Sequence, residues 1–150
     1  MKELGSAHPN VLKLLGWRDT HFNVQLILEL FDLDLRKYIN HQALVASVAK
    51  KLAKDIFSAV TYVHSCQILQ RDIKPPNILV QRQPLAAILG DFGCARKLLR
   101  TSSSAEEQVL SPDVCTLWYR APEILLSHHQ YGCPSDIWSV GVVLAEMKIC

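Results

Sequence analysis

Residues 70–77 read Gln-Arg-Asp-Ile-Lys-Pro-Pro-Asn, and two shorter motifs follow along the chain: Asp-Phe-Gly at 91–93 and Ala-Pro-Glu at 121–123. Each motif alone has an ordinary explanation, in which the aspartates are turn residues, the asparagine is a cap and the lysine is a solvated cation. Three motifs in this order, with 18 residues between Asp72 and Asp91, are a far more specific signal. The stretch at 70–77 is therefore the best starting point for predicting the fold.

The segments beside the motifs have the patterns of short strands. Residues 77–80 and 86–89 are mostly apolar and are joined by polar residues, which predicts a hairpin. Strands are also predicted at 11–17 and at 24–30, where alternation places four apolar side chains on one face: Val24, Leu26, Leu28 and Leu30. Residues 97–113 have no periodicity, and a loop of that length inside a compact domain is usually functional.

Helices are predicted as well, so the chain belongs to the α+β class. A short helix through Tyr38 has Asp32 and Asp34 as candidate caps. A longer helix at 46–64 has one apolar stripe with lysines opposite. The segment 134–147 begins with a proline and is apolar nearly all round, so we expect it to be buried at the centre of the molecule.

Composition places the chain among ordinary globular proteins of about one domain. Of its 150 residues, 49% are hydrophobic and 20% are charged, which excludes a disordered, collagenous or disulfide-rich protein. The net charge of +2 gives no reason to expect a nucleic-acid or membrane partner. Five widely spaced cysteines without a Cys-x-x-Cys pair predict reduced thiols. We therefore expect a soluble intracellular protein of the cytoplasm or nucleus.

Together the three motifs resemble the catalytic loop, the magnesium loop and the end of the activation segment of eukaryotic protein kinases. The resemblance extends over essentially the whole chain. It implies a partial protein-kinase fold: the last N-lobe strands, the hinge and the helical C-lobe up to the central F helix. On this alignment the partial kinase domain is 1–150, in which 1–31 hold the end of the C-helix, the N-lobe strands and the hinge. Residues 32–150 form an incomplete C-lobe, with the activation segment at 91–123.

Two further stretches are similar to cyclin-dependent kinases, within the CMGC group. They are Thr-Leu-Trp-Tyr-Arg-Ala-Pro-Glu at 116–123 and Asp-Ile-Trp-Ser-Val-Gly at 136–141. Lys74 is typical of serine/threonine kinases rather than tyrosine kinases. The resemblance implies proline-directed transfer of the ATP γ-phosphate to Ser or Thr of a protein substrate, with a cyclin-like activator as a partner.

The resemblance also assigns roles to residues of the catalytic and magnesium loops. Asp72 would orient the substrate hydroxyl and accept its proton, and Lys74 would place a cation beside the transferred phosphate. Asn77 and Asp91 would supply oxygen ligands to Mg²⁺, a hard cation that shares such ligands with phosphates. ATP and Mg²⁺ are the implied cofactors.

An ATP pocket is implied by the same alignment. Leu28 is the gatekeeper, and Glu29 and Phe31 offer backbone groups to adenine. Asp34 lies near the ribose, and Leu79 forms the apolar floor. Ordinary core packing would explain the two leucines equally well, and both interpretations can hold together.

Regulatory and substrate residues are implied in the activation segment. Ser111 stands where relatives carry an activating phosphate, although a plain turn is the alternative and other hydroxyls of the loop compete with it. Arg71 and Arg96 match the two basic residues that bind that phosphate, and such a cluster can order a loop. Thr116 and Arg120 match residues that border the pocket for the substrate residue after the phosphoacceptor, often proline.

The sequence departs from the family pattern in three places. Gln70 stands where the catalytic loop usually has His, a packing and hydrogen-bonding residue. Gly90 precedes the Asp-Phe-Gly motif, where a small residue is tolerated. The 150 residues contain no Gly-rich phosphate loop, third-strand lysine or C-helix glutamate ahead of the motifs. An active kinase needs that Lys–Glu ion pair, so we expect this chain to have little or no activity on its own.

The missing part of the C-lobe has consequences for two features of the chain. The helix at 134–147 would expose large apolar faces, and Glu123 would lack the late arginine that pairs with it in relatives. The first alternative is a non-catalytic, kinase-like interaction module that competes for a cyclin-like partner or a substrate. The second is an unrelated soluble α+β protein, which the order of the three motifs disfavours.

Overall fold

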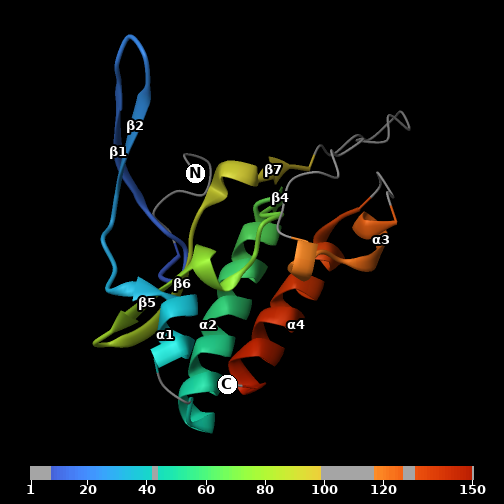
Figure 1. Cartoon of the computed structure of the whole chain (residues 1–150). Coiled ribbons are helices and arrows are strands. Elements are labelled where there is room, and N and C mark those ends of the chain that lie inside the picture. The colour runs from blue at the N-terminus through green and yellow to red at the C-terminus, as the bar shows by residue number, and fades with distance from the viewer. Residues whose placement is uncertain (1–7, 42–43, 99–116, 127–130, 150) are drawn as a thin grey trace.

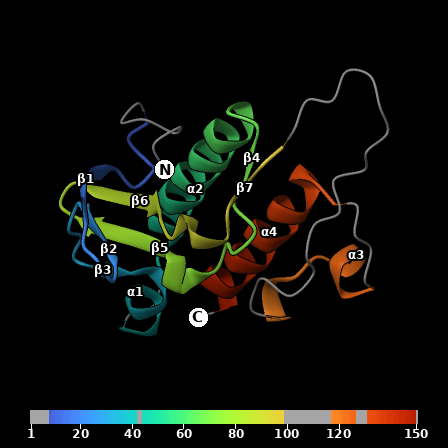
Figure 2. The same cartoon turned by 90° about the horizontal axis from the view of Figure 1, so that it is seen from above.

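The computed structural model describes residues 8–41, 44–98, 117–126 and 131–149 (Figure 1). Its main elements are a two-stranded hairpin, a small antiparallel sheet and two long helices that lie side by side (Figures 1 and 2). The hairpin extends away from the long helices, and the sheet packs against one of them. The mixture of strands and helices confirms the predicted α+β class.

The hairpin consists of β1 (Leu14–Asp19) and β2 (Val24–Leu28), paired antiparallel. The pairing register shifts between Leu14 and Gly16, so β1 contains a β-bulge. An extra residue in one strand shifts by one position which side chains point to each face. Leu14 and Trp17 therefore face the same side although they are three positions apart, and both line the same cavity.

The strand predicted at 11–17 is wrong at both ends, because its first residues are bound elsewhere. Val11 forms a parallel bridge with Leu89, and the Leu12 N–H donates to the Leu89 carbonyl at 2.9 Å. The hairpin strand begins beyond these residues. The same contact attaches the base of the hairpin to the sheet below it.

The second sheet has three antiparallel strands in the order β3-β5-β6. These strands are β3 (Leu33–Asp34), β5 (Ile78–Arg82) and β6 (Leu85–Leu89). The pairing of β5 with β6 confirms the predicted hairpin. This sheet positions the motifs, because residues 70–77 lead into β5 and residues 91–93 follow β6. After their resemblance, these two segments are called the catalytic loop and the magnesium loop below.

A short helix, α1 (Leu35–His41), follows β3 directly. The Asp34 carboxylate accepts the Lys37 N–H at 2.8 Å, so Asp34 caps this helix as predicted. Asp32 was the other candidate cap, and that part of the prediction is wrong. Its carboxylate instead accepts the Arg82 N–H at 2.8 Å and joins the start of β3 to the end of β5.

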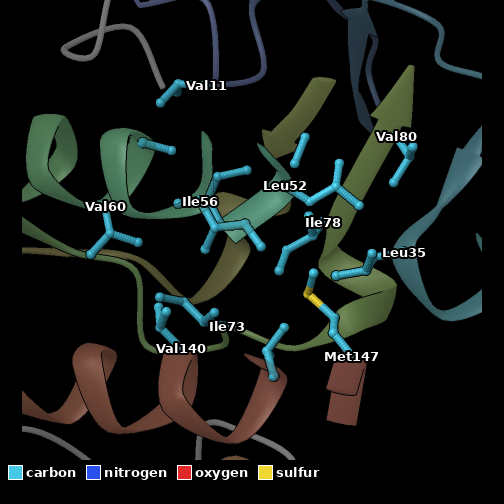
Figure 3. Packing of buried hydrophobic residues seen from close by; sticks show 14 of the residues in the cluster. Val11, Leu35, Leu52, Ile56, Val60, Ile73, Ile78, Val80, Val140 and Met147 are labelled. Carbon is cyan, nitrogen blue, oxygen red and sulfur yellow. The ribbon is translucent and has the colours of Figure 1, made fainter. Parts of the chain in front are cut away.

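The core lies between the sheet and the two long helices, α2 (Ala46–Ser65) and α4 (Cys133–Ile149). The predicted helix at 46–64 thus differs from α2 by one residue. Its apolar stripe packs toward the sheet and α4, and Figure 3 shows Val140 and Met147 of α4 pointing into the same cluster. The buried apolar residues of α2 are Leu52, Ile56, Ala59, Val60 and Val63.

The last helix is buried on one face only. Val140 and Val143 are fully buried, whereas Ile137 and Trp138 are 45% and 50% exposed. The prediction of burial on all sides is therefore wrong, and the expectation that apolar faces would be exposed is confirmed. Among the described residues, no helix has the length and apolar character needed to cross a membrane.

Short elements connect these parts and carry the motifs. They are β4 (Ile68–Leu69), η2 (Pro75–Asn77), η3 (Phe92–Cys94), β7 (Arg96–Lys97), η4 (Leu117–Tyr119) and α3 (Pro122–Leu125). β4 pairs antiparallel with β7. Because one strand precedes the catalytic loop and the other follows the magnesium loop, this pairing brings the two loops together.

Candidate active site

The catalytic loop brings three of the predicted catalytic side chains into contact. Lys74 Nζ lies 2.8 Å from Asp72 Oδ2. The Asn77 side-chain amide donates to the Asp72 carbonyl and to Asp72 Oδ2, both at 2.9 Å. Asp72 is only 7% exposed, so its carboxylate is oriented by a cation and an amide donor in a nearly buried place.

Two prolines explain why the loop turns back on itself. Pro75 and Pro76 begin the 3₁₀ turn η2, and the Asn77 N–H donates to the Lys74 carbonyl at 2.9 Å. Proline suits the first positions of a helical turn because its φ is fixed and its missing N–H would have no partner there. The residue before a proline is extended, as Lys74 is. The turn therefore places Asn77 within reach of Asp72.

The magnesium loop holds Asp91 in an unusual backbone conformation. Its φ of 45° lies in the left-handed region, which is uncommon for any residue except glycine. Asp91 Oδ1 accepts the Gly93 N–H at 3.2 Å, which supports this turn locally. Asp91 itself is exposed and stands at the wall of a cavity.

That cavity has a volume of about 540 Å³ and lies between the hairpin and the magnesium loop. One face of the hairpin forms most of its wall, and the wall is largely apolar. Its lining residues are Leu12, Leu14, Trp17, Asp19, Val24, Leu26, Leu28, Asp91, Phe92 and Gly93. A cavity of this size with few polar groups is typical of a small-molecule site.

Asn77 and Asp91 have the chemistry expected of magnesium ligands. Because the Asn77 nitrogen donates to Asp72, its amide oxygen is left as an acceptor. The described residues hold no cluster of three or more His, Cys, Asp or Glu side chains that suits a metal ion. Mg²⁺ is usually held by one or two protein oxygens together with substrate phosphates and water. The residues present therefore fit Mg²⁺ shared with a phosphate ligand.

Asp136, at the start of α4, anchors the catalytic loop from below. Its carboxylate accepts the backbone N–H groups of Gln70 and Arg71, both at 2.9 Å. His64 Nε2 lies 2.8 Å from Asp136 Oδ2. Asp136 is 1% exposed, so one buried carboxylate fixes the loop backbone just before Asp72. Sequence reasoning did not single it out, although it stands in the quoted Asp-Ile-Trp-Ser motif.

A second polar network joins α1, η4 and α4. Arg36 pairs with Glu146 and donates to the Tyr119 hydroxyl at 2.5 Å, and that hydroxyl donates to Glu146 at 3.0 Å. Burial and then the hydrogen bond to Glu146 raise the pKa of Tyr119. The hydrogen bond to Glu146 likewise raises the pKa of Arg36. Ser139 donates to the Tyr119 carbonyl at 2.7 Å, so this segment is held from both sides.

The predicted ATP-binding residues are only partly brought together. Leu28 and Asp91 line the same cavity. Glu29 is exposed and Phe31 is half-buried, and neither lines that cavity. Asp34 and Leu79 lie opposite each other in the pairing of β3 with β5, away from the cavity wall, and the Asp34 carboxylate is engaged as a helix cap.

The predicted regulatory and substrate residues are only partly described. Ser111 and Thr116 lie outside the described residues. Arg71, with a φ of 68°, donates to the Cys94 carbonyl at 2.7 Å and to the Tyr131 hydroxyl at 3.1 Å. Arg96 is exposed in β7, and Arg120 is half-buried after η4. Within the described part of the chain, Glu123 forms no ion pair.

Comparisons with known proteins agree with this arrangement. The family model described as "Protein kinase domain" matches residues 1–149. The chain is 37% identical, over 151 aligned residues, to "Cell division control protein 2 homolog 1" of Trypanosoma brucei brucei; the match covers 99% of this chain and 48% of that relative. A solved structure, of the yeast RNA Pol II CTD kinase CTDK-1 complex, matches with a TM-score of 0.83 and 34% identity, covering 97% of this chain and 47% of that one.

The chain thus spans about half the length of the proteins it matches. The fold, the order of the motifs and the contacts around Asp72 all point the same way. The chain therefore belongs to the protein kinase family.

Proposed function

We propose that residues 1–150 carry the catalytic-loop half of a site that transfers the γ-phosphate of ATP to Ser or Thr of a protein. The observation that carries this proposal is the contact of Asp72 with both Lys74 and Asn77. Phosphoryl transfer depends on positioning and charge more than on covalent chemistry, and these contacts position one carboxylate beside one cation.

The residues have distinct roles in this proposal. As the substrate hydroxyl oxygen bonds to the γ-phosphorus, its proton passes to Asp72 and the bond from phosphorus to the ADP oxygen breaks. Lys74 binds the transferred phosphoryl group, and Asn77 and Asp91 would hold Mg²⁺. When bound, Mg²⁺ neutralises negative charge on the phosphates. The cavity beside Asp91 is the proposed place of the nucleotide, with Leu28 in its wall.

Substrate class, partner and location belong to the same proposal. The named relatives, a cell-division-control homolog and a CTD kinase in a complex, support a proline-directed protein substrate and a cyclin-like activator. To Thr116 and Arg120 we assign recognition of the substrate residue that follows the phosphoacceptor, and to Arg71 and Arg96 the binding of a phosphate on Ser111. Cys66, Cys94 and Cys133 are free thiols, which favours a reducing intracellular location.

A chimera tests the proposal. In the Trypanosoma relative, the segment matched by this chain is replaced with residues 1–150, and phosphate transfer from labelled ATP to a Ser-Pro peptide is measured with Mg²⁺. We expect activity, and we expect Asp72→Asn to lower kcat by about 10²- to 10⁴-fold, as for loss of a general base. Asp32→Asn, an exposed aspartate, is the matched control and leaves the rate unchanged.

The same assay separates the alternatives. The 150-residue chain alone is expected to transfer no phosphate above the Asp72→Asn background. A folded chimera that is inactive beside an active parent would overturn the catalytic proposal. If that inactive chimera still bound a cyclin, the non-catalytic interaction module would be supported instead.

A further inference from the structure

Gln70, the residue that departs from the family motif, is completely buried and bonds to both loops of the site. It is 0% exposed. Its amide nitrogen donates to the Gly90 carbonyl at 3.1 Å and to the Asp91 carbonyl at 2.9 Å. Its amide oxygen accepts the Asp72 N–H at 2.7 Å. One side chain thus links the backbone of Asp72 to the backbone of Asp91.

The chemistry of the amide suits these three bonds. A side-chain amide has two N–H donors on one atom and an acceptor oxygen on the other. Both N–H donors and the oxygen of Gln70 form hydrogen bonds, so no polar group of this buried side chain is left without a partner. A neutral histidine offers one donor and one acceptor, and would satisfy at most one carbonyl of the magnesium loop.

The two donated bonds fall where the backbone needs support. Asp91 has a left-handed φ of 45°, a conformation that persists in non-glycine residues only when the surroundings hold it. The bonded carbonyls belong to Asp91 and to the residue before it. The bond from Gly93 to the Asp91 carboxylate is longer, at 3.2 Å, and lies on an exposed turn. Gln70 therefore provides the buried part of the support.

We propose that Gln70 is a positioning residue that fixes the proton acceptor Asp72 and the cation ligand Asp91 relative to each other. The catalytic role of Gln70 rests on the proposed function, because Gln70 acts only by positioning Asp72 and Asp91. That Gln70 joins the two loops does not depend on the proposed function, because it concerns hydrogen bonds within the chain.

Amide hydrogen exchange on the 150-residue chain tests the geometric part without ATP or metal. Gln70→Met keeps the length of the side chain and removes all three bonds. We expect exchange at Asp72 and Gly93 to accelerate by about five- to tenfold relative to the amides of β5 and β6. Gln81→Met, the same change at a half-buried strand position, is the control and accelerates neither amide. Equal exchange in Gln70→Met and the unaltered chain would overturn the proposal.

Magnesium dependence in the chimera tests the catalytic part. We expect Gln70→Met to raise the Mg²⁺ concentration at half-maximal rate by about 10- to 100-fold, as for loss of an outer partner of a metal ligand. The KM for the peptide should change by less than about twofold. Gln70→His, assayed at pH 8, keeps one bond on each side and should recover most of the loss.

Failure of the proposal for Gln70 can be distinguished from failure of the proposed function. A merely structural role would lower the amount of folded enzyme and leave the Mg²⁺ dependence unchanged, and that result would overturn the proposal. If the chimera with Gln70 is itself inactive, the proposed function fails, and the exchange experiment still decides whether Gln70 joins the two loops.

Discussion

The catalytic loop and the β1–β2 hairpin place polar and apolar side chains in opposite ways. In and beneath the loop, polar side chains such as Gln70, Asp72 and Asp136 are buried. In the hairpin, apolar side chains such as Phe22 and Leu26 are exposed. The core itself is mostly apolar, but in these two regions burial follows the number of elements that pack around a residue rather than its polarity.

The cause is the layer structure. The loop lies among β4, β7, α2 and α4, and no buried side-chain nitrogen or oxygen of the described residues lacks a hydrogen-bond partner. The hairpin is a two-stranded sheet, and such a sheet has marginal stability without a layer over it. We therefore expect the stability of the chain to be concentrated below the hairpin.

The largest effect is expected at Asp136. Asp136→Ala removes the acceptor of two backbone N–H groups and leaves His64 without its carboxylate. We expect the free energy of unfolding to fall by about 3–5 kcal/mol in urea denaturation. Asp32→Ala, which removes a single exposed hydrogen bond, should cost about 1 kcal/mol or less. Equal losses in the two variants would contradict the comparison.

A matched pair of leucines tests the comparison directly. Leu35 is 0% exposed in α1, and Leu30 is 93% exposed just after β2. Leu35→Ala should lower the free energy of unfolding by about 2–5 kcal/mol, because it leaves a cavity in the core. Leu30→Ala should change it by less than about 0.5 kcal/mol. A large loss in Leu30→Ala would show that the hairpin has a partner layer in solution.

A smaller effect is expected at the network that joins α1 to α4. Tyr119→Phe removes the hydroxyl that bonds Arg36 and Glu146, but these two remain paired with each other. We expect a loss of about 0.5–1.5 kcal/mol by thermal or urea unfolding. Tyr38→Phe is the control, since its hydroxyl bonds to no other described residue. A neutral result at Tyr119 would mean that the Arg36–Glu146 pair alone holds the segment.

The smallest effect concerns alkaline pH. Burial and Glu146 raise the pKa of Tyr119 above its ordinary value of 10.0, so the folded state keeps the proton longer than the unfolded state. The stabilisation is therefore complete below about pH 10 and is lost as the pH rises through the folded-state pKa. Burial also raises the pKa of Cys133, but this thiol is present both in the unaltered chain and in Tyr119→Phe and so does not distinguish them. Between pH 9 and 11, urea unfolding should show a smaller fall in the free energy of unfolding for Tyr119→Phe than for the unaltered chain.

Local parts of the fold could be predicted from the sequence, and distant pairings could not. The 20-residue helix α2 has enough turns for its apolar stripe to be unmistakable. β4 and β7 have two residues each, and their pairing joins positions far apart in the chain. No periodicity can reveal strands that short. Val11 was predicted to begin the first strand, but it forms an isolated bridge with Leu89. That partner is distant in sequence, so no local pattern reveals the pairing.

The site divides in the same way. Asp72, Lys74 and Asn77 stand within six residues, so one short motif identified all three, and the proline turn brings them into contact. Arg36 and Tyr119 are 83 positions apart, and no pattern in the sequence connects them. Gln70 was expected to weaken the kinase pattern. Its three hydrogen bonds depend on where the magnesium loop lies, which the sequence alone did not reveal.

The bulge in β1 has a consequence for insertions and deletions. One residue between Leu14 and Gly16 is extra to the pairing with β2. Deletion of Leu15 would leave Leu14 opposite Leu28 in a regular ladder, with the same side chains facing the cavity. Deletion of Arg18 would move Trp17 by one register position and turn it to the opposite face. The face that the hairpin turns toward the cavity thus depends on the number of residues in β1, and position 15 is where a residue is most easily lost.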